Sequence, residues 1–160
     1  MKTLIVQRHA KAESIGNTDW ERKLSMQGKE EAAIVAALLV ERKYPVDMIY
    51  SSPAKRAIKT AKIFAKIADK SISLIETVPV LYHGNCEDIL SWLRNIDPRF
   101  NCLLLVGHNP ILSELAELFS PCPIGVLKPA DAVILQFDVS DWLALSPATC
   151  FMAQRFMPGK

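Results

Sequence analysis

The sequence lacks the features that mark several classes of protein. Its four cysteines are scattered singly with no CxxC pair, so we expect neither a disulfide framework nor a cysteine-based metal site. No apolar run approaches the roughly 20 residues that a membrane-spanning helix needs. The formal net charge of +2 is too small to indicate binding to nucleic acid or to a membrane surface.

The N-terminal apolar run is too short for a signal peptide. It is interrupted by Gln7, Arg8 and His9, whereas a secretory signal needs an unbroken apolar stretch. Together with the scattered cysteines, this favours a reducing compartment, and we expect a cytoplasmic protein. The length of 160 residues, without repeats or linkers, predicts one domain over residues 1–160.

Short apolar runs alternate with helical patterns along the chain. The runs Leu4–Val6, Met48–Tyr50 and Cys102–Val106 are typical of buried strands. Two further strand-like runs, 132–137 and 149–156, are expected to pair as neighbours. The pattern predicts a three-layer α/β fold with a mostly parallel sheet, helices on both faces and the C-terminal strands at one edge.

The segments between these runs show loop and capping signals. A polar loop of unusual length, residues 11–23, follows the first strand, and long loops in compact domains are often functional. We expect Ser25, Ser52 and Asn109 to cap helices, with a proline after each of the last two at the first helical position. A stripe of lysines follows the second cap: Lys55, Lys59, Lys62 and Lys66. Such a stripe is usually a solvated face, and partner docking is the alternative.

Basic residues stand at the ends of three predicted strands. Arg8 and His9 end the first strand, Ser52 and Arg56 follow the second, and His108 follows the third. Right-handed crossovers would bring all of them to one sheet edge, where ligands of α/β sheets bind and helix N-termini offer amides to an anion. Each residue alone has a simpler structural interpretation, but their joint occurrence predicts a phosphate site that requires no metal ion.

Four segments resemble the motifs of the histidine phosphatase superfamily, the phosphoglycerate-mutase-like group. They occur in the family's order across the first two-thirds of the chain. The small size and the Arg-His-Ala-Lys-Ala start look most like the compact SixA-type phosphohistidine phosphatases. The matching segments are Arg8–Ala10, Leu24–Ala32, Ser51–Ala61 and Gly107–Asn109.

This resemblance implies a covalent mechanism that uses no cofactor. His9 would attack phosphorus and carry the phosphoryl group until water releases it. Arg8, Arg56 and His108 would hold the phosphoryl oxygens and stabilise the developing charge. Three further substrate contacts are implied in the same way: Arg22, Asp19 and Asn109.

Two departures from the family pattern matter. Ala10 replaces the family's glycine, which crowds the turn after the histidine. Larger relatives carry a glutamate as general acid after the third strand, where this chain reads Leu81-Tyr82-His83-Gly84. Asp19, Glu76 and His83 are the open candidates for an acid.

The absence of a positioned acid has a physical consequence. A leaving alkoxide needs a positioned proton donor, whereas a leaving imidazole, whose conjugate acid has a pKa of ~6.5, departs as a neutral ring once solvent has protonated it. The sequence therefore favours cleavage of P–N bonds, and we expect a phosphatase of phosphohistidine on a signalling or phosphotransfer protein. The alternatives are a small-molecule phosphomonoesterase of the same superfamily and a phosphate-binding module without turnover. The sequence leaves the oligomeric state open.

Overall fold

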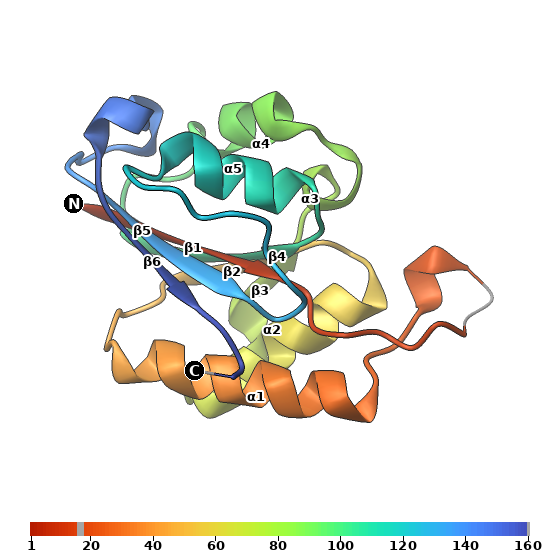
Figure 1. The fold of residues 1–160 in the computed structure, drawn as a ribbon. Coiled ribbons are helices and arrows are strands. Elements are labelled where there is room, and N and C mark those ends of the chain that lie inside the picture. Colours follow the sequence, from red (N-terminus) through yellow and green to blue (C-terminus); the bar gives the residue numbers. More distant parts are fainter. Residues whose placement is uncertain (16–17, 160) are drawn as a thin grey trace.

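The computed structural model describes residues 1–15 and 18–159, and a six-stranded sheet lies at its centre (Figure 1). The strand order is β3-β2-β4-β1-β5-β6. The strands are β1 (Lys2–Arg8), β2 (Met48–Ser51), β3 (Ile75–Thr77), β4 (Cys102–Gly107), β5 (Ala132–Phe137) and β6 (Cys150–Phe156). The first four run parallel, and β5 is antiparallel to both β1 and β6. The expected α/β fold, with the C-terminal pair at one edge, is confirmed.

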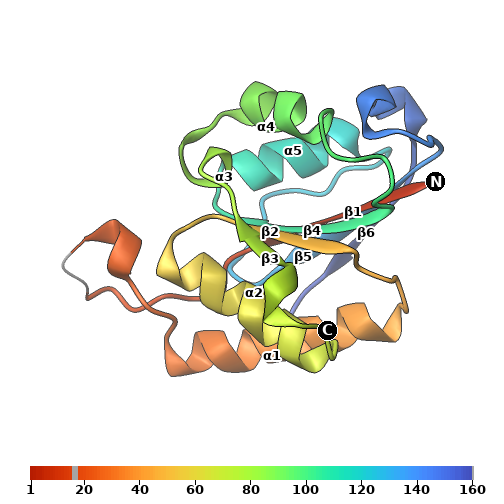
Figure 2. The same cartoon turned by 180° about the vertical axis from the view of Figure 1, so that it is seen from behind.

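Helices cover both faces of the sheet. Figures 1 and 2 show α1 and α2 on one face and α3, α4 and α5 on the other. Their bounds are α1 (Met26–Glu41), α2 (Lys55–Ile67), α3 (Val80–His83), α4 (Cys86–Leu93) and α5 (Ile111–Phe119). No helix in the described part of the chain combines the length and apolar character needed to cross a membrane.

Burial on both faces explains why the strands read as continuous apolar runs. In β1, Ile5 joins the core beneath α1 and α2, whereas Leu4 and Val6 join the core on the opposite face. All six residues of β4 are buried, which confirms its predicted central position. The edge strand β3 is only three residues long, with two of them exposed. Strands covered on both faces lack the polar alternation of a half-exposed sheet.

One of the three expected helix caps is confirmed and two are wrong. The Ser25 hydroxyl accepts a hydrogen bond from the amide of Gly28 at 3.0 Å and caps α1. Ser52 does not cap α2, which begins at Lys55, and Asn109 does not cap α5, which begins at Ile111. Each of these side chains bonds to one neighbour in sequence, Ala54 for Ser52 and Ser113 for Asn109, and to one group distant in sequence, so neither takes the capping position.

The long loop after β1 extends beyond the sheet. It carries the short 3₁₀ helix η1 (Asp19–Glu21), which projects past the ends of the parallel strands (Figures 1 and 2). Residues 16 and 17 of this loop lie outside the described residues. The loop is tied back where Ala12 and Leu24 form an isolated antiparallel bridge.

We predict that Gly28→Ala destabilises the fold. A Cβ atom at Gly28 would lie 2.1 Å from the backbone oxygen of Lys11, which cannot move aside as a side chain can. The free energy of unfolding should fall by about 2 kcal/mol, as in other overpacked sites. Urea denaturation measures this change. Gly159→Ala is the control, because nothing lies within 4 Å of its Cβ position, and equal stability of the two variants would contradict the prediction.

Candidate active site

The candidate site forms where three parallel strands end together. Arg8 of β1 pairs with Gly107 of β4, and Ser51 of β2 pairs with Val106. The amide of His9 then donates to the oxygen of Gly107 at 2.9 Å, which fixes the backbone just beyond the sheet. This register brings together the ends that carry the predicted histidines and arginines.

His9 presents one unprotonated ring nitrogen, Nε2, to the site. Its Nδ1 lies 2.7 Å from the carbonyl oxygen of Ala10, so Nδ1 carries the hydrogen and donates it there. The lone pair on Nε2 accepts a hydrogen bond from Nε of Arg56 at 3.3 Å. The imidazole is therefore fixed in the tautomer that suits nucleophilic attack through Nε2.

The surroundings of His9 keep the ring neutral. Burial is the largest cause that lowers its pKa, to about 4, and the nearby charges of Arg56, Arg8 and Arg22 act in the same direction. The hydrogen bond to Ala10 opposes the shift only in part. At neutral pH the nitrogen is therefore unprotonated and available to a phosphorus atom.

His108 directly follows β4 and also contacts Arg56. Its ring centroid lies 5.1 Å from that of His9, and its Nδ1 accepts from Nη2 of Arg56 at 3.4 Å. Its Nε2 lies 2.7 Å from the hydroxyl of Ser52, to which it donates its hydrogen. Burial, followed by the proximity of His9 and Arg56, lowers the pKa of His108 to about 3.

Arg56 is buried and its guanidinium is shared among three partners. Besides the two histidines, it contacts Asp19 twice, through the backbone oxygen at 2.5 Å and the carboxylate at 2.9 Å. The Asp19 carboxylate also accepts from the hydroxyl of Tyr82 at 2.7 Å and from Arg22 at 3.3 Å. Tyr82, and then Arg56, hold the pKa of Asp19 at about 2. An anionic group therefore already lies against the predicted phosphate-binding arginine.

Arg8 and Asn109 meet at one carbonyl oxygen. Nη1 of Arg8 donates to the oxygen of Leu127 at 3.0 Å, and the Asn109 amide donates to the same oxygen at 2.6 Å. The Asn109 carbonyl accepts from Ser113 at 2.7 Å, so both ends of this side chain hold the protein itself. The Asn109 side chain thus fixes the acceptor of Arg8, and the substrate contact expected of Asn109 stays a prediction. Nε of Arg8 is buried without a partner among the described residues, which makes it a candidate donor to an anion.

The three candidates for a general acid lie in different places. Asp19 is inside the site, but a carboxyl with a pKa of about 2 is a poor proton donor at neutral pH. Glu76 lies on the edge strand β3, opposite Tyr50, and has no contact with the site groups described above. The ring of His83 packs edge to face against Tyr82, with centroids 4.7 Å apart.

Sequence reasoning missed Tyr82 and the hydroxyl of Ser52 as parts of the site. The ring of Tyr82 packs against His108 and Trp20, with centroid distances of 5.3 Å and 5.1 Å. Tyr82 therefore connects η1 to the sheet edge that carries the candidate site. The only sequence signal for Tyr82 was its place after the third strand, where larger relatives carry their acid.

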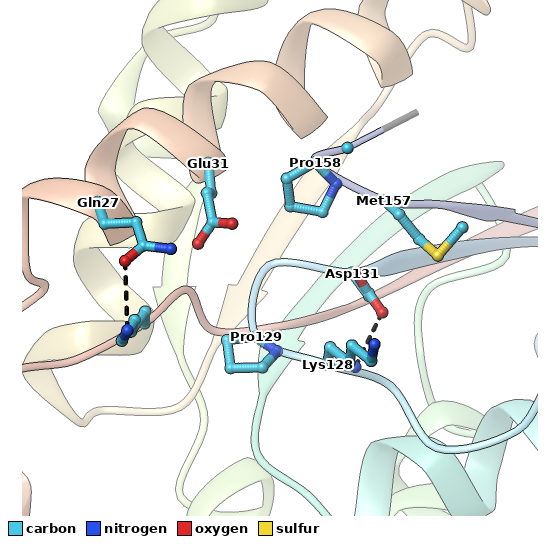
Figure 3. A pocket seen from close by; sticks show the side chains of 9 residues that line it. Gln27, Glu31, Lys128, Pro129, Asp131, Met157 and Pro158 are labelled. Carbon is cyan, nitrogen blue, oxygen red and sulfur yellow. Dashed lines mark hydrogen bonds between the residues drawn. The ribbon is translucent and has the colours of Figure 1, made fainter.

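Four hollows in the described part of the chain are lined by residues other than His9, Arg56 and His108. A hollow of about 490 Å³ is lined by α1, the 128–131 segment and the C-terminal segment (Figure 3). Its charged side chains are of both signs, with Glu31 and Asp131 beside Lys11 and Lys128. Within residues 1–15 and 18–159, no group of three or more His, Cys, Asp or Glu side chains is placed to hold a metal ion.

Comparisons with known proteins agree with this arrangement. Residues 4–115 match the model of the histidine phosphatase superfamily, branch 1. The protein histidine phosphatase SixA, solved with tungstate, superimposes with a TM-score of 0.84 at 19% identity, covering 98% of this chain and 97% of that one. A proposed phosphohistidine phosphatase SixA from Agrobacterium tumefaciens gives 0.72 at 26% identity, covering 84% and 91%. An uncharacterised chloroplast protein of Arabidopsis thaliana is 28% identical over 151 residues, covering 88% of this chain and 69% of that protein.

The pKa of His9 predicts a pH-dependent stability. The folded-state value of about 4 lies below the ordinary 6.5, so between these values the unfolded chain binds more protons and stability falls as the pH falls. Between pH 7 and 5, His9→Asn should therefore lose about 2 kcal/mol less than wild type. Denaturant titrations at both pH values measure this difference. His83→Asn is the control and should follow wild type, and parallel behaviour of His9→Asn and wild type would contradict the prediction.

Asp19 should compete with a bound anion for Arg56. We predict that Asp19→Asn binds inorganic phosphate about fivefold more tightly than wild type, because a carboxylate paired with Arg56 no longer has to be displaced. Calorimetric titration measures the affinity. Asp97→Asn removes a carboxylate paired with Arg99, away from the site, and should leave phosphate binding unchanged. Weaker binding by Asp19→Asn would show that this carboxylate assists the anion.

Proposed function

The chain belongs to the histidine phosphatase superfamily, and from that membership we propose that it removes phosphoryl groups from phosphohistidine side chains of proteins, through a covalent intermediate on His9. Membership in the family supports phosphatase activity in general. The substrate class and the roles of the individual residues are our proposal.

The observation that carries the proposal is the unequal state of the titratable groups. His9 is a neutral base with its Nε2 lone pair aimed at Arg56, and the carboxyl that shares this arginine, on Asp19, has a pKa of about 2. The site thus has a nucleophile and positive charge, but its one carboxyl is a poor donor of a proton to a leaving group. That combination suits a leaving group that needs no positioned acid.

In the first step, the Nε2 lone pair of His9 forms a bond to phosphorus while the P–N bond of the substrate breaks. The electron pair of that bond stays on the substrate imidazole, which leaves as a neutral ring because its other nitrogen is already protonated. Arg56 then turns its Nε–H from the histidine nitrogen to a phosphoryl oxygen. Arg8 supplies a further donor to the equatorial oxygens through its unpartnered Nε–H, and His108 supplies one when the hydrogen on its Nε2 turns from the Ser52 hydroxyl to a phosphoryl oxygen.

In the second step, water attacks the phosphorylated His9. The hydrogen on Nδ1, held by the oxygen of Ala10, makes the ring leave as neutral imidazole when the P–Nε2 bond breaks. Both protons of the water remain on the released phosphate, so no further donor is needed. The hydrogen bond from Nδ1 of His9 to the oxygen of Ala10 therefore supports both the attack on phosphorus and the release of phosphate.

The rim of the site is also suited to a flat ring. Tyr82 lies edge to face beside His108, and the exposed ring of Trp20 packs against the same tyrosine. Aromatic side chains pack favourably against an imidazole, which a sugar phosphate does not offer. This supports phosphohistidine over a small phosphoester.

We predict that the purified protein prefers a phosphohistidine peptide to glucose 6-phosphate. The ratio of kcat/KM should be at least about 100, the size of a general acid's contribution that the P–O substrate would miss. Phosphate release, measured with both substrates, gives this ratio of kcat/KM. Equal or faster hydrolysis of the sugar phosphate would replace the proposal with a small-molecule phosphomonoesterase.

A trapping experiment tests the covalent step separately. Wild type should incorporate label from a radiolabelled phosphodonor, while His9→Ala should not. His83→Ala, with an exposed histidine changed, is the control and should be labelled like wild type. Wild type that binds phosphate without any labelling or turnover would identify a binding module rather than an enzyme.

A further inference from the structure

A small hollow beside the candidate site is lined almost entirely by lysines. It has a volume of about 180 Å³ and lies between the starts of α1 and α2. Lys23, Lys29, Lys55 and Lys59 surround it, and Leu24 is the one other lining residue. Two of these lysines belong to the stripe on α2, whereas Lys62 and Lys66 of the same stripe do not line the hollow.

These four ammonium groups have no counter-ion in the fold. Among residues 1–15 and 18–159, every ion pair within 4 Å involves other residues. Lys55 and Lys59 are also four residues apart on one helix, a spacing at which like charges repel. The proximity of these lysines therefore does not stabilise the fold.

The helix starts add to this unfavourable charge. Neither α1 nor α2 has an acidic residue in its first turn, although a negative charge there would offset the helix dipole. Instead, Lys55 is the first residue of α2, where a positive charge is disfavoured. Three separate features thus concentrate uncompensated positive charge at one place, which points to a partner that supplies the negative charge.

The hollow is connected to the candidate site through adjacent residues. Lys55 immediately precedes Arg56, whose guanidinium contacts His9, and Lys23 immediately follows Arg22, which pairs with Asp19. A macromolecule seated over the lysines would therefore lie on the same two segments that carry Arg22 and Arg56 into the candidate site.

We infer that this lysine hollow docks acidic side chains of the phosphorylated protein substrate. The inference rests on the proposed function and names the kind of protein surface that the site receives. The carboxylates of the partner pair with the four lysines and orient its phosphohistidine toward His9. Such charge pairing raises the rate of encounter and weakens with salt.

Two synthetic peptides of equal length, each with one phosphohistidine, test this docking surface. One carries glutamates around the histidine and the other carries glutamines. At low salt, wild type should hydrolyse the acidic peptide with a kcat/KM about tenfold higher, and the ratio should approach one at about 0.5 M salt. Lys55→Gln/Lys59→Gln should lose the preference and keep its activity on the neutral peptide.

The matched control keeps the net charge equal. Lys62→Gln/Lys66→Gln removes the same charge from the same helix but away from the hollow, and should retain the preference of wild type. Equal turnover of the two peptides by wild type, or equal effects of the two double variants, would overturn the docking surface while leaving the proposed function intact.

Binding of unphosphorylated peptides separates the two proposals. Fluorescence anisotropy should show that wild type binds the acidic peptide severalfold more tightly than the neutral one, and that Lys55→Gln/Lys59→Gln does not. This preference without any turnover of the phosphorylated peptides would support the docking surface and overturn the proposed function. Binding to phosphatidylserine vesicles but not to the acidic peptide would assign the lysines to a membrane and overturn the inference.

Discussion

The site depends on one buried guanidinium. Arg56 lies in the first turn of α2 with its side chain almost fully removed from water, and it contacts His9, His108 and Asp19 at once. A buried positive charge is costly unless hydrogen-bond acceptors and an opposite charge surround it. Two neutral imidazoles supply acceptors and one carboxylate supplies the charge. Burial is the largest cause that keeps both histidines neutral, and the permanent cation between them disfavours protonation of either ring further.

The sheet register is what makes that arrangement possible. β1, β4 and β2 are neighbours and parallel, so their last residues lie side by side although they are distant in sequence. Helices cover both faces of the sheet, so these strands carry buried apolar side chains on both faces until the functional residues begin. Stability therefore resides in the buried strand bodies, and the strand ends are free to carry polar groups.

The register and apolar character of the strands explain which parts of the site could be predicted from the sequence. The positions of His9, His108 and Arg56 at one edge follow from apolar runs, their polar ends and parallel topology, all of which are visible in the sequence. Ser52 and Asn109 were predicted as helix caps from a local rule that the fold overrides. Their side chains instead bond to His108 and to the oxygen of Leu127, contacts that only the folded chain creates.

Tyr82 shows the limit of sequence reasoning most clearly. Its hydroxyl meets Asp19 across 63 positions of the chain, and no periodicity or motif indicates this contact. Yet the contact is the largest cause that lowers the pKa of Asp19 to about 2, and it helps to hold this carboxylate beside Arg56 as a counter-ion. A phosphoryl group brings more negative charge than the carboxylate that it would displace, and η1, which carries this carboxylate, has no buried residue. The carboxylate thus stabilises the unliganded arginine while leaving the stronger anion an energetic advantage, which is the property that a reversible phosphate site requires.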